Sequence, residues 1–437
     1  MRVLFVTWPF TGHYHPMAPL GWGLRAAGHE VLVASNPSFA SAITRAGLTA
    51  LPAGPEFDVG AEVRAEYLAG RWTAPDAWSP EAKLRRRREL NGLLAPRHSA
   101  AAMADDVVSF ARSWRPDLVV FEPMAFAGPL VAGVLGVPAV RQLWTADFTA
   151  GLDQLERRLL GPLFARFGVG EIGVLGDLTL DPCPPRLQIA DGKPRQPVRY
   201  IPYNGPAVLP GWLVDPPPRR RVCVTWGTSL TRMGGAERMA HVPGVVRALA
   251  RFDVEVVVAV LDSQRGLFAD MPENARSLGP VPLHLLLPSC DLIVHQGGGG
   301  TLMTAMICGL PQLIVPSIPD QAFNARQVEA TGAGRYVPGG EDVTVAEVAA
   351  AAALLLDDPA YRDASRQLRA EAVAMPTPAD IVPALERLAG SRARTRDAKR
   401  SLAAWPGGMS WARRRSGEGS PEASQGRGPD RDCGMAD

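Results

Sequence analysis

The sequence predicts an α/β protein made of two doubly wound, Rossmann-like domains that face each other across a cleft. Its 437 residues exceed what a single hydrophobic core usually supports, which indicates two domains. In both halves, short apolar runs alternate with helical patterns, as expected for parallel sheets covered on both faces. A proline-rich stretch at residues 206–218 separates the two series and predicts a stiff linker.

The first half begins with an apolar run, a turn, an amphipathic helix that ends at Gly28 and a second apolar run, which together form a βαβ unit. Residues 57–78, rich in glycine, proline and aromatic residues, are predicted to be a long loop. Strands are predicted at residues 3–7, 29–35, 48–52, 117–121 and 137–142, and helices at 17–27, 39–46, 80–114, 125–135 and 152–167.

The second half repeats this alternation after the linker. Strands are predicted at residues 222–226, 254–260, 292–295 and 312–315, and helices at 242–250, 283–287, from 321 onward and within 345–373. The expected organisation is an N-terminal domain at 1–205, the linker, a C-terminal domain at 219–375, a helix at 376–390 that could return to the first domain, and a disordered tail at 391–437.

Composition argues against several classes of protein. The net charge of +2 gives no reason to expect nucleic acid as a partner. The five cysteines form no C-x-x-C pair, which predicts reduced thiols in a cytoplasmic protein. Neither a signal peptide nor a segment long enough to span a bilayer is recognisable. The single D-x-D, Asp430 to Asp432, lies in the low-complexity tail and is not expected to bind metal.

Residues 291–301 contain a short apolar run, a histidine, four glycines and a threonine before a helical pattern. Unpaired N–H groups at a helix start favour an anion, so a diphosphate is expected against residues 298–301, with His295 and the Thr301 hydroxyl as further donors. The alternative is a tight turn whose glycines only allow close packing.

His13 and Glu122 are the candidate catalytic residues of the first half. His13 lies in the loop after the first predicted strand and Glu122 directly follows the strand at 117–121, so both are expected at the same edge of one parallel sheet. A neutral imidazole there could accept a proton from a substrate hydroxyl, and a carboxylate could hold its second nitrogen. His15 competes with His13 for the first role, and Glu122 could instead cap the following helix.

Polar residues after strands of the second half match a sugar nucleotide. Thr228 offers a hydroxyl to a phosphate oxygen, and the neighbouring pair Asp320 and Gln321 suits sugar hydroxyls. Helix capping explains the same residues equally well.

Taken together, five motifs resemble family 1 glycosyltransferases of the GT-B fold. They are Gly12-His13-x-x-Pro16, Phe121-Glu122-Pro-x-x-Phe-Ala-Gly128, Arg199-Tyr-Ile-Pro-Tyr-Asn-Gly205, Pro282-x-x-x-Leu-Leu-Pro-Ser-Cys290 and His295-x-Gly-Gly-x-Gly-Thr301. The resemblance covers residues 1 to about 390 and is strongest to actinomycete enzymes that attach deoxysugars or aminosugars to macrolide and anthracycline polyketides.

This resemblance implies roles for individual residues. His13 corresponds to the base of the family and Glu122 to its supporting acid, which is commonly Asp in the wider family. The implied donor-binding residues are Thr228, Val281, His295, Gly298, Gly300, Thr301, Asp320 and Gln321. Aromatic residues near the first strand and in the loops are candidates for an apolar acceptor wall, although most aromatics in such a chain are core residues: Trp8, Phe10, Trp78 and Trp144.

The implied reaction is inverting transfer of a deoxysugar from a dTDP-sugar to a polyketide hydroxyl in antibiotic biosynthesis, with no metal or other cofactor. Several relatives need a cytochrome-P450-like auxiliary protein, but the region after Trp144 is short here, which argues against an obligatory partner. The sequence leaves a homodimer open. The alternatives are a nucleotide-sugar epimerase or hydrolase on the same fold and a non-catalytic accessory protein that binds the sugar nucleotide.

Overall fold

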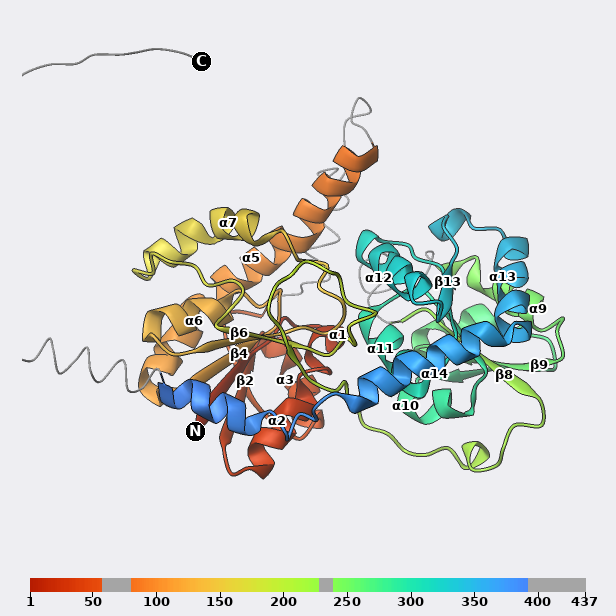
Figure 1. Ribbon diagram of the computed structural model, residues 1–437, viewed down its shortest axis with the longest axis horizontal. Helices are drawn as coiled ribbons and strands as arrows, with labels where there is room; N and C mark the ends of the chain where they lie inside the picture. The colour runs from red at the N-terminus through yellow and green to blue at the C-terminus, as the bar shows by residue number, and fades with distance from the viewer. Residues whose placement is uncertain (57–79, 228–238, 392–437) are drawn as a thin grey trace, which may run out of the picture. The chain divides into compact units, whose positions relative to one another are not determined.

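The computed structural model describes residues 1–56, 80–227 and 239–391, without the side chains of residues 80–95 and 341. Within these ranges the chain forms two sheets, each flanked by helices (Figure 1). Every strand pairing in both sheets is parallel, so the predicted fold class is confirmed.

The first sheet has the strand order β3-β2-β1-β4-β5-β6-β7. Its strands are β1 (Arg2–Val6), β2 (Glu30–Ser35), β3 (Thr49–Pro52), β4 (Leu118–Phe121), β5 (Ala139–Gln142), β6 (Leu178–Asp181) and β7 (Gln196–Pro197). The central strands β1 and β4 are apolar along almost their whole length because helices cover both of their faces. The sheet therefore places the residues that follow β1 and β4 side by side.

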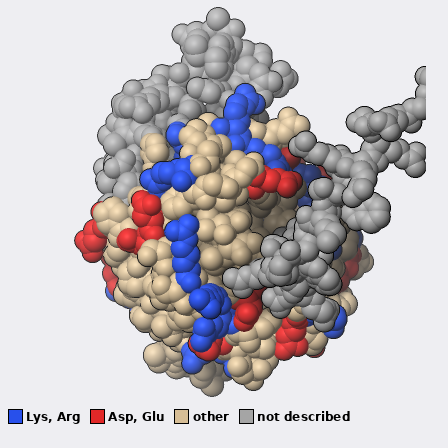
Figure 2. All heavy atoms as spheres, turned by 90° about the vertical axis from the view of Figure 1, so that its left-hand side faces the viewer, with Lys and Arg blue, Asp and Glu red and all other residues tan. Residues whose placement is uncertain are grey.

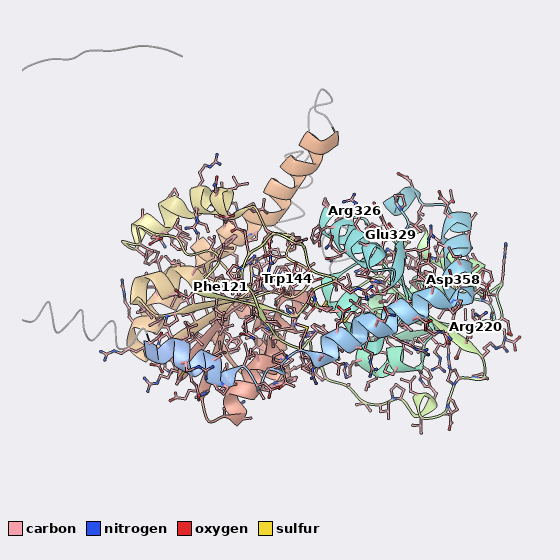
Figure 3. The ribbon with its side chains drawn as sticks, viewed as in Figure 1. Phe121, Trp144, Arg220, Arg326, Glu329 and Asp358 are labelled. Atoms are coloured by element: carbon pink, nitrogen blue, oxygen red, sulfur yellow. The ribbon has the colours of Figure 1, made fainter. Side chains whose placement is uncertain are left out.

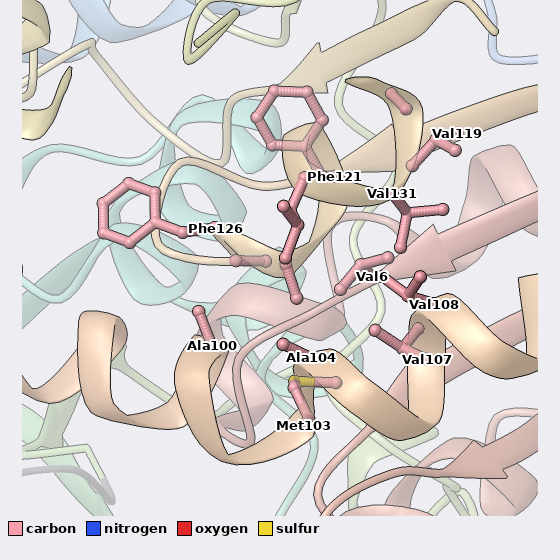
Figure 4. Packing of buried hydrophobic residues seen from close by; sticks show 14 of the residues in the cluster. Val6, Ala100, Met103, Ala104, Val107, Val108, Val119, Phe121, Phe126 and Val131 are labelled. Carbon is pink, nitrogen blue, oxygen red and sulfur yellow. The ribbon is translucent and has the colours of Figure 1, made fainter. Parts of the chain in front are cut away.

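Helices on the two faces of this sheet enclose two separate cores. The helical elements are α1 (Thr11–Tyr14), α2 (Ala18–Ala26), η1 (Pro37–Phe39), α3 (Ala40–Arg45), α5 (Pro80–Trp114), α6 (Ala127–Leu135) and α7 (Asp153–Arg166). On one face, Met103 and Val107 of α5 pack with Val6 and Phe121 (Figure 4). On the other face, α2 and α3 cover alternate residues of the same strands.

The C-terminal end of the described chain contributes to the second of these cores. Ile381, Val382 and Leu385 are buried in the cluster that contains Val3 and Phe5. Ile381 directly precedes the helical segment 382–391, which contains Val382 and Leu385. The C-terminal end is anchored by a 2.6 Å hydrogen bond from the Arg199 backbone N–H to the Pro376 carbonyl.

The second sheet has the order β10-β9-β8-β11-β12-β13. Its strands are β8 (Arg220–Thr225), β9 (Val254–Ala259), β10 (Ala275–Gly279), β11 (Leu292–His295), β12 (Gln312–Ile314) and β13 (Gly334–Tyr336). Its α-helices are α9 (Val242–Leu249), α10 (Leu283–Leu286), α11 (Gly299–Cys308), α12 (Pro319–Ala330), α13 (Val345–Asp357) and α14 (Pro359–Ala374). Short 3-10 turns are η2 (Gly211–Leu213), η4 (Asp262–Phe268), η5 (Leu287–Ser289) and η6 (Gly340–Asp342).

Four strands were not predicted from the sequence: β6, β7, β10 and β13. They are two to five residues long, and β7, β10 and β13 lie at the outer edges of their sheets. Their short segments carry little periodicity, so pairing with a neighbouring strand decides their conformation. The predicted loop at 57–78 and the tail from 392 lie outside the described residues.

In the described ranges, charged side chains of both signs occur on the surface and the cysteines are unpaired. On the face in Figure 2, acidic and basic side chains both occur, between wide uncharged areas. Cys183, Cys223, Cys290 and Cys308 are free thiols. The described residues contain no cluster of three or more His, Cys, Asp or Glu side chains that could hold a metal ion. None of the helices in these ranges is long and apolar enough to cross a membrane.

Candidate active site

Each sheet has a topological switch point, where the direction of strand order reverses. In the first sheet it lies between β1 and β4, and in the second between β8 and β11. In open α/β sheets, ligands bind beyond the carboxyl ends of strands at such points. His13 and Glu122 follow β1 and β4, and the glycine turn follows β11, so the sequence motifs occur at the two switch points.

His13 and Glu122 form a direct pair. The register aligns Val6 with Phe121, so both chains leave the sheet at the same level. The His13 Nδ1 atom lies 3.0 Å from the Glu122 Oε2 atom. A carboxylate oxygen accepts this hydrogen bond, so in the neutral imidazole Nδ1 carries the proton and Nε2 keeps its lone pair for another proton.

The Glu122 carboxylate is itself held in place. It is fully buried, and it accepts hydrogen bonds from the backbone N–H groups of Trp8 (2.9 Å) and Met124 (2.8 Å). These bonds compensate for burial of the charge and fix the direction in which the carboxylate meets the imidazole. Both contacts considered for Glu122 from the sequence are present, because it binds His13 and also caps the turn before α6.

His15 lies in a different environment. Its ring makes an edge contact with Tyr203, with ring centroids 4.8 Å apart. Burial, assisted by the charge of Arg45, lowers the pKa of His15 to about 4. Of the two candidate histidines, the structure therefore pairs only His13 with a carboxylate.

Aromatic rings surround the His13 imidazole. Its centroid lies 4.2 Å from the Trp144 ring, 5.2 Å from the Trp8 ring and 6.2 Å from the Phe10 ring. Phe148 extends the group at 5.6 Å from Trp144, which is labelled in Figure 3. Three of the four predicted acceptor residues thus meet at His13, whereas Trp78 lies outside the described residues.

The glycine turn leads directly into α11. Gly297 has a φ of +97°, and a Cβ atom there would lie 2.9 Å from the Gln321 carbonyl oxygen, so only glycine fits without strain. Gly298 is the N-cap, and the first intrahelical bond is donated by Leu302. The amides of residues 299–301 consequently have no partner within the helix and can receive an anion.

His295 differs from its sequence-based interpretation as a direct phosphate donor. It is fully buried; its Nε2 lies 3.0 Å from Gln312 Oε1, and its Nδ1 accepts a 3.1 Å hydrogen bond from the Gly297 N–H. Burial lowers its pKa to about 4, so the ring is neutral. Both nitrogens are occupied by protein groups, so in this structure His295 shapes the glycine turn and offers no donor to a ligand.

Two residues that the sequence did not single out connect the switch points. Asn324 of α12 donates a 2.9 Å hydrogen bond to the Gly297 carbonyl, and Thr145 lies 3.5 Å from the Asn324 Oδ1 atom. Beside Thr145, the Trp144 ring lies 3.0 Å from where a Gly299 Cβ would be. Trp144 therefore touches both His13 and the start of α11. No local pattern could have revealed this, because Trp144 is more than a hundred positions from both His13 and Gly299 in the sequence.

The remaining residues that were predicted to bind the nucleotide sugar lie in different environments. Asp320, in the first turn of α12, is half-buried, and burial raises its pKa. Gln321 is buried and its Oε1 accepts a 3.0 Å bond from the Ser317 N–H, so this side chain supports the loop after β12. Val281 is half-buried beside α10. Thr228 lies outside the described residues.

Comparison with known proteins identifies the family of the chain. The model of the erythromycin biosynthesis protein CIII-like N-terminal domain matches residues 22–227, and that of the corresponding C-terminal domain matches residues 244–388. The chain is 36% identical over 435 residues to the aclacinomycin-T 2-deoxy-L-fucose transferase of Streptomyces galilaeus, covering 91% of this chain and 98% of the relative. It is 38% identical over 426 residues to the 10-deoxymethynolide desosaminyltransferase of Streptomyces venezuelae, covering 90% and 98%.

Solved structures agree with the sequence relatives. The glycosyltransferase VinC, solved in complex with dTDP, superposes with a TM-score of 0.75 at 32% identity, covering 90% of this chain and all of VinC. These relatives are transferases, which favours transfer over the epimerase, hydrolase and accessory alternatives. The chain therefore belongs to the erythromycin biosynthesis protein CIII-like family of GT-B glycosyltransferases.

Proposed function

We propose that the protein transfers a deoxysugar or aminosugar from a dTDP-sugar to a hydroxyl group of a polyketide, with inversion at the sugar carbon. The donor class is supported by VinC, which binds dTDP, and by two relatives that are named for deoxysugar transfer. A macrolide or anthracycline acceptor is supported by the same relatives and by the aromatic rings around His13.

The His13–Glu122 pair is the observation that carries this proposal. Glu122 fixes the tautomer that leaves Nε2 unprotonated, and Trp8, Phe10 and Trp144 provide apolar surface for an aglycone around that atom. His13 Nε2 removes the proton of the acceptor hydroxyl as its oxygen attacks the sugar carbon. The imidazolium that forms is stabilised by the buried carboxylate.

On the donor side, the start of α11 binds the diphosphate. The amides of residues 299–301 and the helix dipole stabilise the negative charge that develops when the sugar–phosphate bond breaks. Asp320, in the first turn of α12, lies close enough to His13 for the two side chains to interact electrostatically. Its carboxylate is proposed to bind a hydroxyl of the transferred sugar.

Replacing His13 by alanine tests the proposal. General-base catalysis is typically worth about 10²- to 10⁴-fold, so H13A should lower kcat by that order. Binding of dTDP should stay within about twofold of the wild type, because the diphosphate amides are on another element. Turnover is measured by mass spectrometry with the purified chain, a dTDP-deoxysugar and a macrolactone acceptor, and dTDP binding by calorimetry.

Two further variants make this test specific. E122Q keeps the shape of Glu122 but places an amide among three hydrogen-bond donors, so it should also lower kcat. H15A should retain kcat apart from any loss of folded protein, because His15 contacts Tyr203 and not Glu122. If H13A kept full turnover and H15A lost it, the general base would be His15 and not His13.

A further inference from the structure

The peptide between Gly300 and Thr301 is the target of hydrogen bonds that the proposed reaction does not use directly. Its carbonyl, that of Gly300, accepts a 2.7 Å hydrogen bond from the Thr304 hydroxyl, and the Tyr200 hydroxyl lies 3.5 Å away. Thr304 is fully buried and Tyr200 is nearly so. The N–H of this same peptide unit belongs to Thr301, the last of the three amides free to receive an anion.

The Thr304 hydroxyl is in turn oriented by Asn204, which lies in the connector between the two sheets, residues 198–219. The Asn204 Nδ2 atom donates to Thr304 Oγ1 at 3.2 Å. Because the Thr304 oxygen accepts this bond, its own hydrogen is directed to the Gly300 carbonyl. Asn204 and Thr304 are a hundred residues apart, and no sequence motif links them.

The amide of Asn204 has only one possible orientation. Its Oδ1 atom accepts the backbone N–H of His284 at 2.9 Å and lies 3.1 Å from the His284 Nδ1 atom. A backbone N–H can only donate, so the oxygen must face His284 and the NH2 group must face Thr304. The direction of the whole chain of hydrogen bonds is therefore fixed by covalent chemistry.

We propose that Asn204 and Thr304 are positioning residues for the donor diphosphate. They form a relay, His284 to Asn204 to Thr304 to the Gly300 carbonyl, whose donors all point the same way and end at the Thr301 N–H. Hydrogen bonds aligned head to tail strengthen one another, so the relay makes this N–H a better donor to a phosphate oxygen and keeps the first turn of α11 in place. This inference rests on the proposed function, because it assumes that the diphosphate binds at the start of α11.

A second feature of the turn is consistent with a ligand at this position. Gln296, 4% exposed, has a buried Oε1 atom without a hydrogen-bond partner in the described structure. Its amide nitrogen lies 2.9 Å from where a Gly298 Cβ would be, beside the N-cap of α11. Buried polar atoms are normally satisfied, so the unpartnered Oε1 acceptor favours a bound group that donates a hydrogen bond, such as a sugar hydroxyl.

The relay is tested by binding of dTDP and, by competition, of thymidine, which lacks the diphosphate. T304V preserves the shape of the side chain but removes the hydroxyl, and should weaken dTDP binding on the order of three- to tenfold while thymidine binding stays unchanged. T304S, which restores the hydroxyl, should return dTDP affinity toward the wild-type value. S365A is the matched control, since Ser365 is equally buried and donates a 2.8 Å bond to the Tyr361 carbonyl within α14.

A double-mutant cycle checks that the two residues act in series. N204A alone should weaken dTDP binding, but in the T304V background it should have little further effect, because the relay is already broken. If T304V does not fold, N204A and T304S carry the same comparison between dTDP and thymidine. Additive losses, or equal losses for both ligands, would overturn the relay. Failure of the wild-type protein to bind dTDP would instead overturn the proposed function.

Discussion

At the scale of single residues, Gly297 sets the conformation of the turn between β11 and α11. It joins β11 to α11 with a positive φ, and both its N–H and its carbonyl have side-chain partners, His295 and Asn324. Any side chain there would be strained and would also press on the Gln321 carbonyl. The shape of the anion-binding turn is thus set by a residue without a side chain.

We expect G297A to lower the free energy of unfolding by about 1–3 kcal/mol, the usual cost of an unfavourable backbone conformation, and more if the contact with Gln321 does not relax. G390A is the matched control, because Gly390 lies within helical residues 382–391 with open space where its Cβ would be. That change should be neutral or stabilise the protein by up to about 1 kcal/mol. Urea unfolding measures both, and equal effects of the two substitutions would contradict this account of Gly297.

At the scale of elements, the C-terminal segment joins distant parts of the chain. After α14 the chain passes Arg199 and buries Leu385 against the first sheet, so a segment at the end of the sequence completes a core that begins at Val3. The His29 Nε2 atom lies 3.0 Å from the Glu386 carboxylate, but Glu386 is about half exposed, and partly exposed pairs of this kind add little. Apolar burial therefore holds the segment.

We expect L385A to destabilise the protein by about 2–5 kcal/mol, the range for a large buried side chain replaced by alanine. L388A, one turn further along, should cost clearly less because Leu388 is only partly buried. Thermal denaturation compares the two variants. Similar losses in both would show that Leu385 does not contribute to the core as the structure indicates.

At the scale of the whole molecule, two buried carboxyl groups near Asp147 make stability depend on pH. Burial raises the pKa of Glu156 from 4.5 to about 7, with charges of Arg141, Asp147, Asp153 and Lys193 nearby. Burial likewise raises the pKa of Asp181 from 3.8 to about 6. The folded state thus holds protons that the unfolded state releases, so stability falls as pH rises between the unfolded and the folded pKa values.

E156Q should remove much of this dependence. Glutamine has the shape of the protonated acid but cannot ionise, so the variant should match the wild type near pH 4.5 and exceed it above pH 7 by up to about 3 kcal/mol. Denaturant unfolding across this pH range measures the difference. E171Q, which changes an exposed glutamate, should follow the wild-type profile. A parallel shift of the E156Q curve at all pH values would contradict the assignment.

The sequence by itself determined the architecture and the location of the site. Apolar runs and helical periods repeat in both halves, and they follow local rules of conformation that each short segment obeys alone. Since His13, Glu122 and the glycine turn all follow predicted parallel strands, their place at the carboxyl edges was predictable as well. The GT-B fold and the transferase class were confirmed by the comparisons.

Only the tertiary structure decided which groups meet. It gave His13 and not His15 the carboxylate partner, occupied both nitrogens of His295, and set Trp144 against Gly299. It also turned Asn204 of the connector toward Thr304. Such contacts join side chains that are distant in sequence, and their geometry depends on how whole sheets and helices pack, which no local pattern of residues encodes.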